Sequence, residues 1–302
     1  MMTSAGSIDG LYVFLAALNI FLSITASLNN ALILIALHKV TSIYPPTKLL
    51  FRCLAVTDLA VGLISQPLFV LSLLFWKADL DINWDVLISI SNASGVSVVI
   101  LRAVSILSST AISVDRLLAL MLGLRYRHVV SLRRVRALII CVWMLSCALA
   151  AGLQFGEDKI HSITLNMFLV MITVCILTSF ISYTKIYLRF RHHQIQLQEI
   201  RQQQGQPLPN RGGIPLNIAR YKKMVSSIAW VQLTSIICYL PFSVCHILWF
   251  HDAIKPLGGA LDVTFSFFFL NSSLNPILYC WKIKDVRKAV KDTIKSNCCT
   301  SS

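Results

Sequence analysis

LNSSLNPILYCWKIKDVRKAV, residues 270–290, indicates most clearly what kind of protein this is. Its first half is apolar enough for a membrane, yet it carries polar and helix-breaking residues, namely Asn271, Ser272, Ser273, Asn275 and Pro276. After Trp281 the stretch becomes basic and amphipathic. A proline frees one backbone carbonyl of its helix and permits a hinge. The stretch therefore suggests a membrane helix that can change shape just before it leaves the bilayer.

The composition of the whole chain is that of a membrane protein. Of its 302 residues, 56% are hydrophobic and 13% are charged, whereas soluble domains have about 25% charged residues. A helix needs roughly 20 mostly apolar residues to cross a bilayer. Seven segments satisfy this requirement: 11–37, 49–75, 86–122, 137–155, 163–188, 225–250 and 258–281. The sequence therefore predicts an all-α fold, a single bundle of seven transmembrane helices.

The basic residues predict the orientation of this bundle. If the N-terminus lies outside, the three inner connections and the tail hold three, six, eight and six Lys or Arg. The outer connections hold only Lys77, Lys159 and Lys255, and eight of the 13 acidic residues lie outside. Positive charge collects on the cytoplasmic side of membrane proteins. We therefore expect the net charge of +14 to face anionic lipid and a cytosolic partner, not nucleic acid.

The cysteines and the longest connection add two further expectations. None of the nine Cys lies in an outer connection or has the spacing of a metal site, so we expect no extracellular disulfide. Residues 189–219 include RQQQGQPLPNRGGIPL, which is rich in Gln, Gly and Pro. This composition predicts a flexible cytosolic linker.

Polar residues inside the predicted spans need a reason, because hydrocarbon does not solvate them. Asp58 lies in the middle of the second span, and Ser105, Asn271 and Asn275 are expected at similar depth. Asn271 and Asn275 are four residues apart and share one helix face. A carboxylate with neutral oxygens suits a hard cation such as sodium. The alternative is a protonated carboxyl that is merely hydrogen-bonded.

The third predicted span carries the one basic residue inside the bundle. Residues recur along it at three- and four-residue steps and so share a face, in the order Arg102, Ser105, Ser109, Ile112 and Arg116. A buried Arg without a partner costs several kcal/mol. Two partners for Arg102 remain open, which are Asp58 and the anionic head of a ligand. Asp115 and Arg116 fall near the inner end, where an interfacial ion pair without a signalling role is the alternative.

Short motifs follow one another along the spans in a distinctive order. They are NNALILIAL with Asn30, LAVTDLA with Asp58, DRL with Arg116, a lone Trp143, SYTKIY with Tyr183, CYLP with Tyr239 and Pro241, and NPILY with Asn275, Pro276 and Tyr279. This set resembles the signatures of the rhodopsin family (class A) of G-protein-coupled receptors over nearly the whole chain. Asn29, Leu117 and Tyr239 replace the Gly, Tyr and Trp that are usual in three of these motifs.

The resemblance implies a receptor, not an enzyme, that binds an extracellular ligand and activates a heterotrimeric G protein at the plasma membrane. Asn275, Pro276 and Tyr279 would form the activation hinge of the seventh helix. Tyr279 and Tyr183 would swing inward and release Arg116 to meet the G protein. Leu124 would be the apolar plug of the second inner connection. The implied coupling and switch set is Asp115, Arg116, Leu124, Tyr183, Tyr239, Pro241, Asn275, Pro276 and Tyr279.

The resemblance also implies how the two ends of the chain are arranged. Residues 1–302 would form one domain, with a short extracellular tail at 1–10, the bundle at 11–281, and an interfacial helix with a cytoplasmic tail at 282–302. Residues 282–295 would lie along the inner membrane face as a short amphipathic eighth helix, in contact with membrane lipid. Cys298 and Cys299 would be palmitoylation candidates.

The ligand is only loosely indicated. The implied pocket consists of Val98, Val99, Arg102, Tyr239, Phe242, His246, Phe265 and Phe269. It is apolar and aromatic, which suits a small apolar or anionic ligand. Val98 stands where amine receptors have Asp, and Phe269 stands where opsins attach retinal to Lys, so neither a biogenic amine nor retinal is expected.

Departures from the family pattern point loosely towards melanocortin-type receptors. Ser91 replaces the Cys at the top of the third helix, and Cys175 replaces a fifth-helix proline; melanocortin-type receptors share both losses. Leu68, Ser91 and Gly95 nevertheless replace the acidic residues that those receptors use for basic peptides. Tyr221 replaces the acidic sixth-helix partner of Arg116, which suggests raised basal activity.

Two other functional classes are less consistent with the sequence. A seven-span transporter or channel could use Asp58 and Arg102, but the chain has no inverted repeat and no paired broken helices. A membrane enzyme is not indicated either, because no His-Glu-x-x-His or Gly-x-Ser-x-Gly motif is present in the spans.

Overall fold

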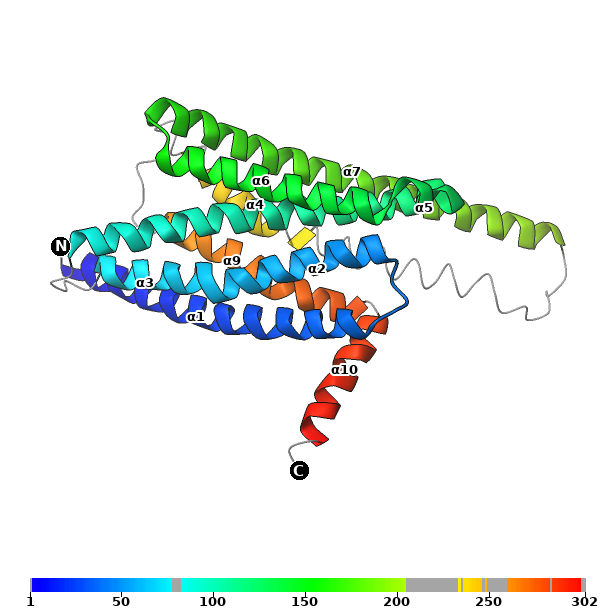
Figure 1. The fold of residues 1–302 in the computed structure, drawn as a ribbon, viewed down its shortest axis with the longest axis horizontal. Helices are drawn as coiled ribbons and strands as arrows, with labels where there is room; N and C mark the ends of the chain where they lie inside the picture. The colour runs from blue at the N-terminus through cyan, green and yellow to red at the C-terminus, as the bar shows by residue number, and fades with distance from the viewer. Residues whose placement is uncertain are drawn as a thin grey trace.

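The computed structural model describes residues 2–77, 83–204, 233–234, 236–245, 248, 260–282 and 284–299. These residues are almost entirely helical, and no strand occurs among them. Figure 1 shows the long helices lying side by side. The all-α prediction is therefore confirmed for the part of the chain that is described.

The helices from α1 to α7 follow one another closely along the chain. In chain order they are α1 (Met2–Lys39), α2 (Pro45–Ala60), the π-helical turn η1 (Val61–Ser65), α3 (Gln66–Lys77), α4 (Trp84–Leu122), the 3₁₀ turn η2 (Gly123–Arg125), α5 (Tyr126–Val129), α6 (Leu132–Phe155), α7 (Asp158–Gln204), a short helix Ile236–Cys245, α9 (Ala260–Lys282) and α10 (Lys284–Cys299). The elements α2, η1 and α3 run on without a break and together form the second predicted span.

Five helical segments are long and apolar enough to cross a membrane: Gly10–Lys39, Pro45–Phe75, Trp84–Val129, Leu132–Phe155 and Asp158–Arg189. They correspond to the first five predicted spans. The sixth, 225–250, lies largely outside the described residues, and its described part includes the short helix Ile236–Cys245. The seventh, 258–281, corresponds to α9.

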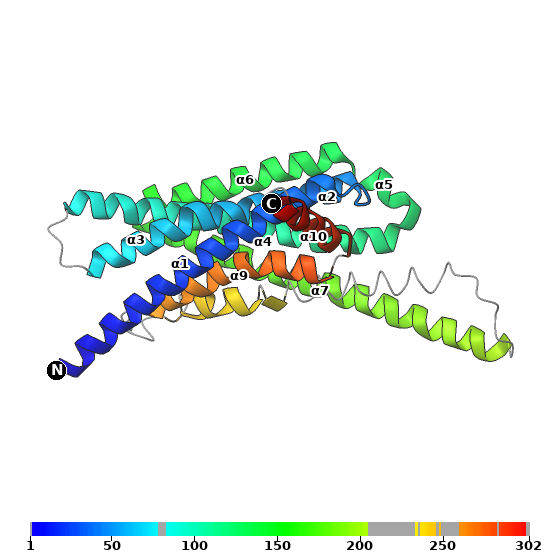
Figure 2. The same cartoon turned by 90° about the horizontal axis from the view of Figure 1, so that it is seen from below.

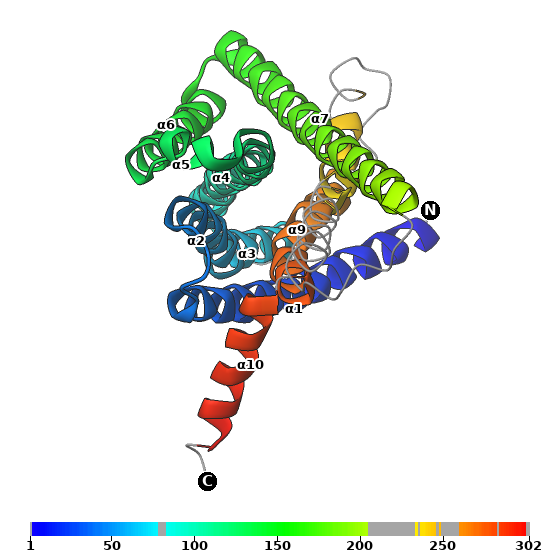
Figure 3. The same ribbon diagram turned by 90° about the vertical axis from the view of Figure 1, so that its right-hand side faces the viewer.

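The helix α4 lies at the centre of the bundle. It contacts α2, α3, α6 and α7, while α9 packs against α1 (Figure 3). The apolar part of α4 is also the most enclosed of the five spans. Polar residues on α4 are therefore buried by neighbouring helices, as the shared face of Arg102, Ser105 and Ser109 suggests.

Two helices extend beyond their predicted ends. The helix α1 begins at Met2 instead of residue 11. The helix α7 continues to Gln204 and projects past the other long helices (Figure 2). The prediction of a flexible linker is therefore wrong for residues 189–204. These residues lack Gly and Pro and include Gln, Arg, Leu and Glu, which are good helix formers, until Gly205 and Pro207 are reached.

Two local irregularities have simple causes. The turn η1 ends two residues before Pro67. The ring of a proline displaces the carbonyl four residues earlier, and Leu63, which carries that carbonyl, lies inside η1. At the far end of α4, Gly123 adopts φ of 51° and begins the turn towards α5. This positive φ is easily adopted by Gly.

The helix α10 leaves α9 and turns away from the bundle (Figure 1). Val286, Ala289 and Thr293 are buried and lie on one face, whereas Lys288 and Lys291 are exposed. Lys39 Nζ at the end of α1 donates a hydrogen bond of 3.0 Å to Thr293 Oγ1. The structure thus contains the predicted short amphipathic helix, anchored on α1, with bounds Lys284–Cys299 instead of 282–295.

Candidate functional site

Ser272 lies in a buried polar cluster that joins four helices. Pro276 is inside α9 and has no backbone N–H, so the carbonyl of Ser272 loses its usual partner within the helix. Asn30 Nδ2 on α1 donates a hydrogen bond of 3.1 Å to that carbonyl. A side chain from another helix therefore compensates the break that the Asn-Pro pair makes, and α1 and α9 are joined at this point.

Asp58 accepts hydrogen bonds from two helices. Its side chain is fully buried. Oδ1 accepts from Ser272 at 2.8 Å and from Ser105 at 3.3 Å, and Oδ2 accepts from Asn275 Nδ2 at 2.8 Å. The structure thus brings together three of the four predicted cation-site residues. Asn271 is also buried on α9, but Ser272 is the residue of that helix that joins Ser105 and Asn275 at the carboxylate.

Sequence reasoning missed Ser272, although a signal for it was present. Ser272 precedes Asn275 by three residues and Pro276 by four, so it lies on the same helix face as Asn275 and carries the carbonyl that the proline frees. Reading this spacing together with Asp58 would have placed Ser272 in the cluster.

The oxygen atoms around Asp58 are chemically suited to a sodium ion. They include the carboxylate, two serine hydroxyls and Asn275 Oδ1, which is buried and has no hydrogen-bond partner among the described residues. Hard cations prefer such oxygen ligands. The nearby charge of Arg102 opposes this, because a second cation would be repelled.

Arg102 reaches the same cluster from α4. Its side chain is only 1% exposed. Nη1 donates a hydrogen bond of 3.1 Å to Ser272 Oγ, and Ser272 in turn donates to Asp58. A serine hydroxyl therefore joins the guanidinium to the carboxylate, in place of the direct ion pair that was one alternative.

Two nitrogen atoms of Arg102 are left over. Nε and Nη2 are buried and have no well-aligned hydrogen-bond partner among the described residues, although the buried Tyr239 hydroxyl lies close enough to interact with the guanidinium. The guanidinium carbon lies 5.2 Å from the ring centroid of Phe269 and 5.8 Å from that of Phe268. These rings attract the charge, but they do not accept the in-plane N–H groups. The guanidinium can thus still donate hydrogen bonds of good geometry to a ligand.

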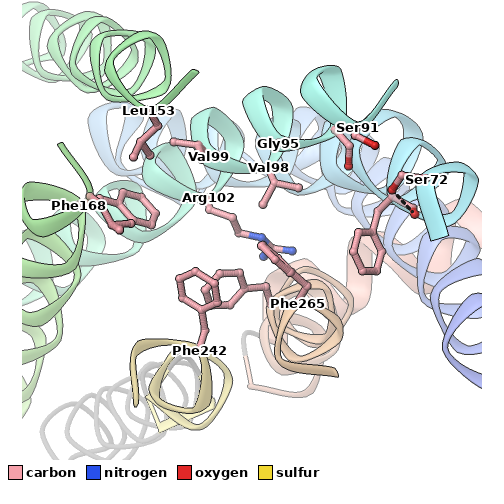
Figure 4. A pocket seen from close by; sticks show the side chains of 14 residues that line it. Ser72, Ser91, Gly95, Val98, Val99, Arg102, Leu153, Phe168, Phe242 and Phe265 are labelled. Carbon is pink, nitrogen blue, oxygen red and sulfur yellow. Dashed lines mark hydrogen bonds between the residues drawn. The ribbon is translucent and has the colours of Figure 1, made fainter. Parts of the chain in front are cut away.

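A cavity of about 230 Å³ lies beside the Arg102 side chain, which points into it (Figure 4). Five residues of the predicted pocket line this cavity: Val98, Val99, Arg102, Phe242 and Phe265. Tyr239 and Phe269 are buried next to Phe268 and Phe69 without lining it. His246 lies outside the described residues.

Nine further residues line the cavity and were not predicted: Phe69, Ser72, Ser91, Ser94, Gly95, Leu153, Leu165, Phe168 and Phe268. They come from α3, α4, α6, α7 and α9. Ser91, Ser94 and Gly95 lie on α4 at three- and four-residue steps that lead to Val98 and Arg102, so these three could have been inferred. Those on α6 and α7 depend on how these helices cross α4, which sequence does not encode locally.

A second polar cluster lies at the predicted cytoplasmic end of α4. Arg116 forms an ion pair with its neighbour Asp115. Asp115 also accepts hydrogen bonds from Thr47 Oγ1 at 2.9 Å and from the Tyr126 hydroxyl at 2.5 Å. Arg116 Nη2 donates to Thr47 as well, at 2.5 Å. The cluster therefore joins α2, α4 and α5, and the sequence contained no sign of Thr47 or Tyr126.

The other predicted switch residues are partly placed. The Tyr183 hydroxyl on α7 donates to Ser113 Oγ of α4 at 3.1 Å, and Pro241 lies in the short helix Ile236–Cys245. Leu124 is 97% exposed in η2, so a large apolar side chain is fully available there. Tyr221 and the side chain of Tyr279 lie outside the part of the chain that the structure describes.

The predicted lipidation residues Cys298 and Cys299 are the last two residues of α10. Their side chains are likewise not described. Six cysteines in the described part, including Cys175 and Cys238 in the core, are free thiols.

Comparison with known proteins identifies the family. The model of the 7 transmembrane receptor (rhodopsin family) matches residues 29–279. The chain is similar to melanocortin receptor 4 of Danio rerio, with 24% identity covering 97% of this chain and 87% of that protein. It is also similar to melanocortin receptor 3 of Rattus norvegicus, with 22% identity over 93% and 84%. Trace amine-associated receptor 1 of Macaca mulatta is 23% identical over 89% and 83%.

These matches confirm the resemblance and the seven-helix fold. The family and the three relatives are receptors, and nothing in the matches favours a transporter or a channel. The matched region begins at Asn29 and ends at Tyr279, so it includes both polar clusters and the cavity. The chain is a membrane protein and belongs to the rhodopsin family of seven-transmembrane, G-protein-coupled receptors.

Proposed function

We propose that this receptor responds to a small apolar molecule with an anionic head group, and that the head group binds Arg102. The observation that supports the proposal is the pair of unpartnered donors, Nε and Nη2, on a buried guanidinium that points into the cavity. Among the described residues that line this cavity, none has an acidic side chain. A carboxylate would satisfy both donors and balance the charge in a site from which water is largely excluded.

The same contact gives the ligand a route to the activation hinge. Arg102 is joined through Ser272 to Asp58, and Asp58 also accepts from Asn275, the residue before Pro276. An anion at Arg102 draws the guanidinium away from Ser272 and thereby weakens one of the contacts that hold α9 in its present position. A ligand acts on a conformational equilibrium only through such differential contacts.

The proposed output is at the opposite end of α4. We place the extracellular ligand on the side of the N-terminus, in the plasma membrane, and the heterotrimeric G protein at Arg116 and Leu124. Nucleotide exchange occurs on the G protein, so the receptor itself carries no catalytic site. Cys298 and Cys299 are proposed to anchor α10 to the inner leaflet once acylated.

Nonanoic acid is a suitable probe for the anion site. Native receptor is expected to bind it, and Arg102→Met is expected to weaken binding by at least about 30-fold, because an interfacial charge pair contributes about 2–5 kcal/mol when one partner is truncated. Affinity is measured as ligand-dependent protection of the purified receptor against thermal unfolding. Nonan-1-ol, which lacks the charge, is the matched ligand, and its affinity should be similar for both proteins. Undiminished binding of nonanoic acid to Arg102→Met would eliminate the proposal.

A sodium ion at Asp58, Ser105, Asn271 and Asn275 remains a proposal, and Arg102 is expected to compete with it. Sodium should stabilise Arg102→Met but not the native receptor, with choline as the control cation. At about ten times its dissociation constant, sodium would add roughly 1.4 kcal/mol. The effect should disappear in Arg102→Met/Asp58→Asn. Equal stabilisation of native receptor and Arg102→Met would show that the guanidinium does not compete.

A further inference from the structure

A second cavity, of about 290 Å³, lies towards the predicted outer end of the bundle. Its lining is Tyr12, Ser72, Leu73, Ser91 and Asp262. Ser72 and Ser91 also line the cavity beside Arg102, and Figure 4 shows both serines at one side of it. The two cavities therefore adjoin at two small hydroxyl side chains, with no bulky residue shared between them.

Asp262 gives the outer cavity an acidic character. Its carboxylate is half-buried and accepts a hydrogen bond from the Tyr12 hydroxyl. No Lys or Arg side chain in the described part of the chain forms an ion pair with Asp262. The first turn of α9 is held in place, because Ser266 Oγ donates to the Asp262 carbonyl and accepts from Asn19 on α1. The acidic side chain of Asp262 is thus held beside the cavity.

The separation between this charge and Arg102 follows from the geometry of α9. Asp262 and Phe269 are seven residues apart, which is two turns, so they share a face and are about 10 Å apart along the axis. The Arg102 guanidinium lies 5.2 Å from the Phe269 ring. Arg102 Nη1 also donates to Ser272 Oγ, and Ser272 is ten residues, or about 15 Å, from Asp262 along the same helix. A cation-binding group and an anion-binding group therefore face adjoining cavities at a spacing of roughly 10–15 Å.

We propose that the ligand is amphoteric, with an anionic head that binds Arg102 and a cationic group, about 10–15 Å away, that binds Asp262. The anionic half of this inference rests on the proposed function, whereas the cationic half rests on Asp262. The class of ligand is an amino acid whose amine and carboxylate are separated by an apolar chain. Such a molecule balances both protein charges, and the apolar chain occupies the mostly aliphatic and aromatic space between them.

The arrangement would also discriminate against simpler ligands. An amine without an acid would meet the positive Arg102 at the inner end of the cavity, where Val98 offers no counter-charge. A monoacid would leave Asp262 without a cation. Specificity of this kind comes from unmatched charges as much as from favourable contacts.

The test compares 8-aminooctanoic acid with nonanoic acid, in which a methyl group replaces the ammonium. Affinities for purified receptor are measured by ligand-dependent thermal protection of native receptor, Asp262→Asn and Arg102→Met. Native receptor is expected to bind the amino acid about tenfold more tightly than nonanoic acid, because a hydrogen bond to a charged group contributes about 1.5–3 kcal/mol. Asp262→Asn should remove this preference while it leaves the affinity for nonanoic acid unchanged. Arg102→Met should weaken both ligands.

Each outcome bears on one half of the proposal. Equal affinity of native receptor for the two acids, or a preference that survives in Asp262→Asn, overturns the cationic subsite and leaves the anion site standing. Loss of the preference in Asp262→Asn with undiminished binding in Arg102→Met overturns the anion site alone. No binding of either acid at millimolar concentration overturns both. Ser266→Ala is the structural control, because it loosens the turn that carries Asp262 but keeps the charge, and it should retain the preference.

Discussion

Arg116→Ala is expected to abolish G-protein activation, both without ligand and with it, at unchanged surface expression. Arg116 is 13% exposed at the end of α4, and its guanidinium is held by Asp115 and Thr47. Released from these partners, it is the cation on the central helix that can reach a protein docked between the inner helix ends. The measurement is dissociation of heterotrimeric G proteins in cells, across the main Gα classes, for native and mutant receptors.

The ligand-free signal of the native receptor is part of this expectation, because Tyr221 stands where the family has an acidic partner for Arg116. Lys288→Ala is the matched control: it removes an exposed positive charge from α10, outside the switch cluster, and should signal like the native receptor. Tyr126→Phe removes a donor from Asp115 and should raise the ligand-free signal. A signal in Arg116→Ala equal to that of the native receptor would contradict the assigned role.

The fold could be predicted largely because the membrane imposes it. A span must be long and apolar, and Lys and Arg mark the inner connections, so composition alone located α1 to α7. The errors fell where the membrane no longer constrains the chain. Beyond residue 188 the sequence is polar, and its continuation as helix to Gln204 depends on local propensity, which the nearby Gly and Pro residues obscured.

In the polar cluster around Asp58, Asp58 and Asn275 were predictable because each is costly within an apolar span. Ser105 was predictable because it shares a helix face with Arg102. The role of Ser272 was not predicted, since serine is common in membrane helices and hydrogen-bonds readily to its own backbone. Its hydroxyl joins two charges and its carbonyl accepts from Asn30. Only the crossing of α1, α4 and α9 brings these groups together, and that crossing is set by packing far along the chain.

The connection through Ser272 suggests why a costly guanidinium is tolerated in the bundle. Asp58 and Arg102 are both buried, and each would be an uncompensated charge without the other. One serine hydroxyl separates the guanidinium from the carboxylate, so the two groups still attract each other. Nε and Nη2 of Arg102 stay available to the cavity. A direct bidentate pair would have consumed those donors. The serine therefore keeps Arg102 available to an anion without leaving its charge isolated.

Asp58→Asn and Arg102→Met are accordingly expected to destabilise the receptor strongly as single variants, and much less when they are combined. Removing one partner of a buried charge pair costs about 3–5 kcal/mol, because the other charge is left unbalanced. Replacing both by neutral side chains of similar size removes that penalty, so the double variant should be more stable than the sum of the singles predicts by about 1–3 kcal/mol. The measurement is the thermal unfolding of the four purified proteins, without ligand and with choline in place of sodium.

The coupling should depend on the hydroxyl that joins the two charges. In a Ser272→Ala background, the double-mutant cycle of Asp58→Asn and Arg102→Met is expected to give a markedly smaller interaction energy. Ser272→Ala removes the hydroxyl that both Arg102 and Asp58 contact. Arg102→Met combined with Asp262→Asn is the matched control, because sites about 10 Å apart without a shared partner add nearly independently. An Asp58/Arg102 coupling no larger than this control would mean that the guanidinium does not balance Asp58. The proposed route from the cavity to Asn275 and Pro276 would then be lost, whereas an anion site at Arg102 would remain possible.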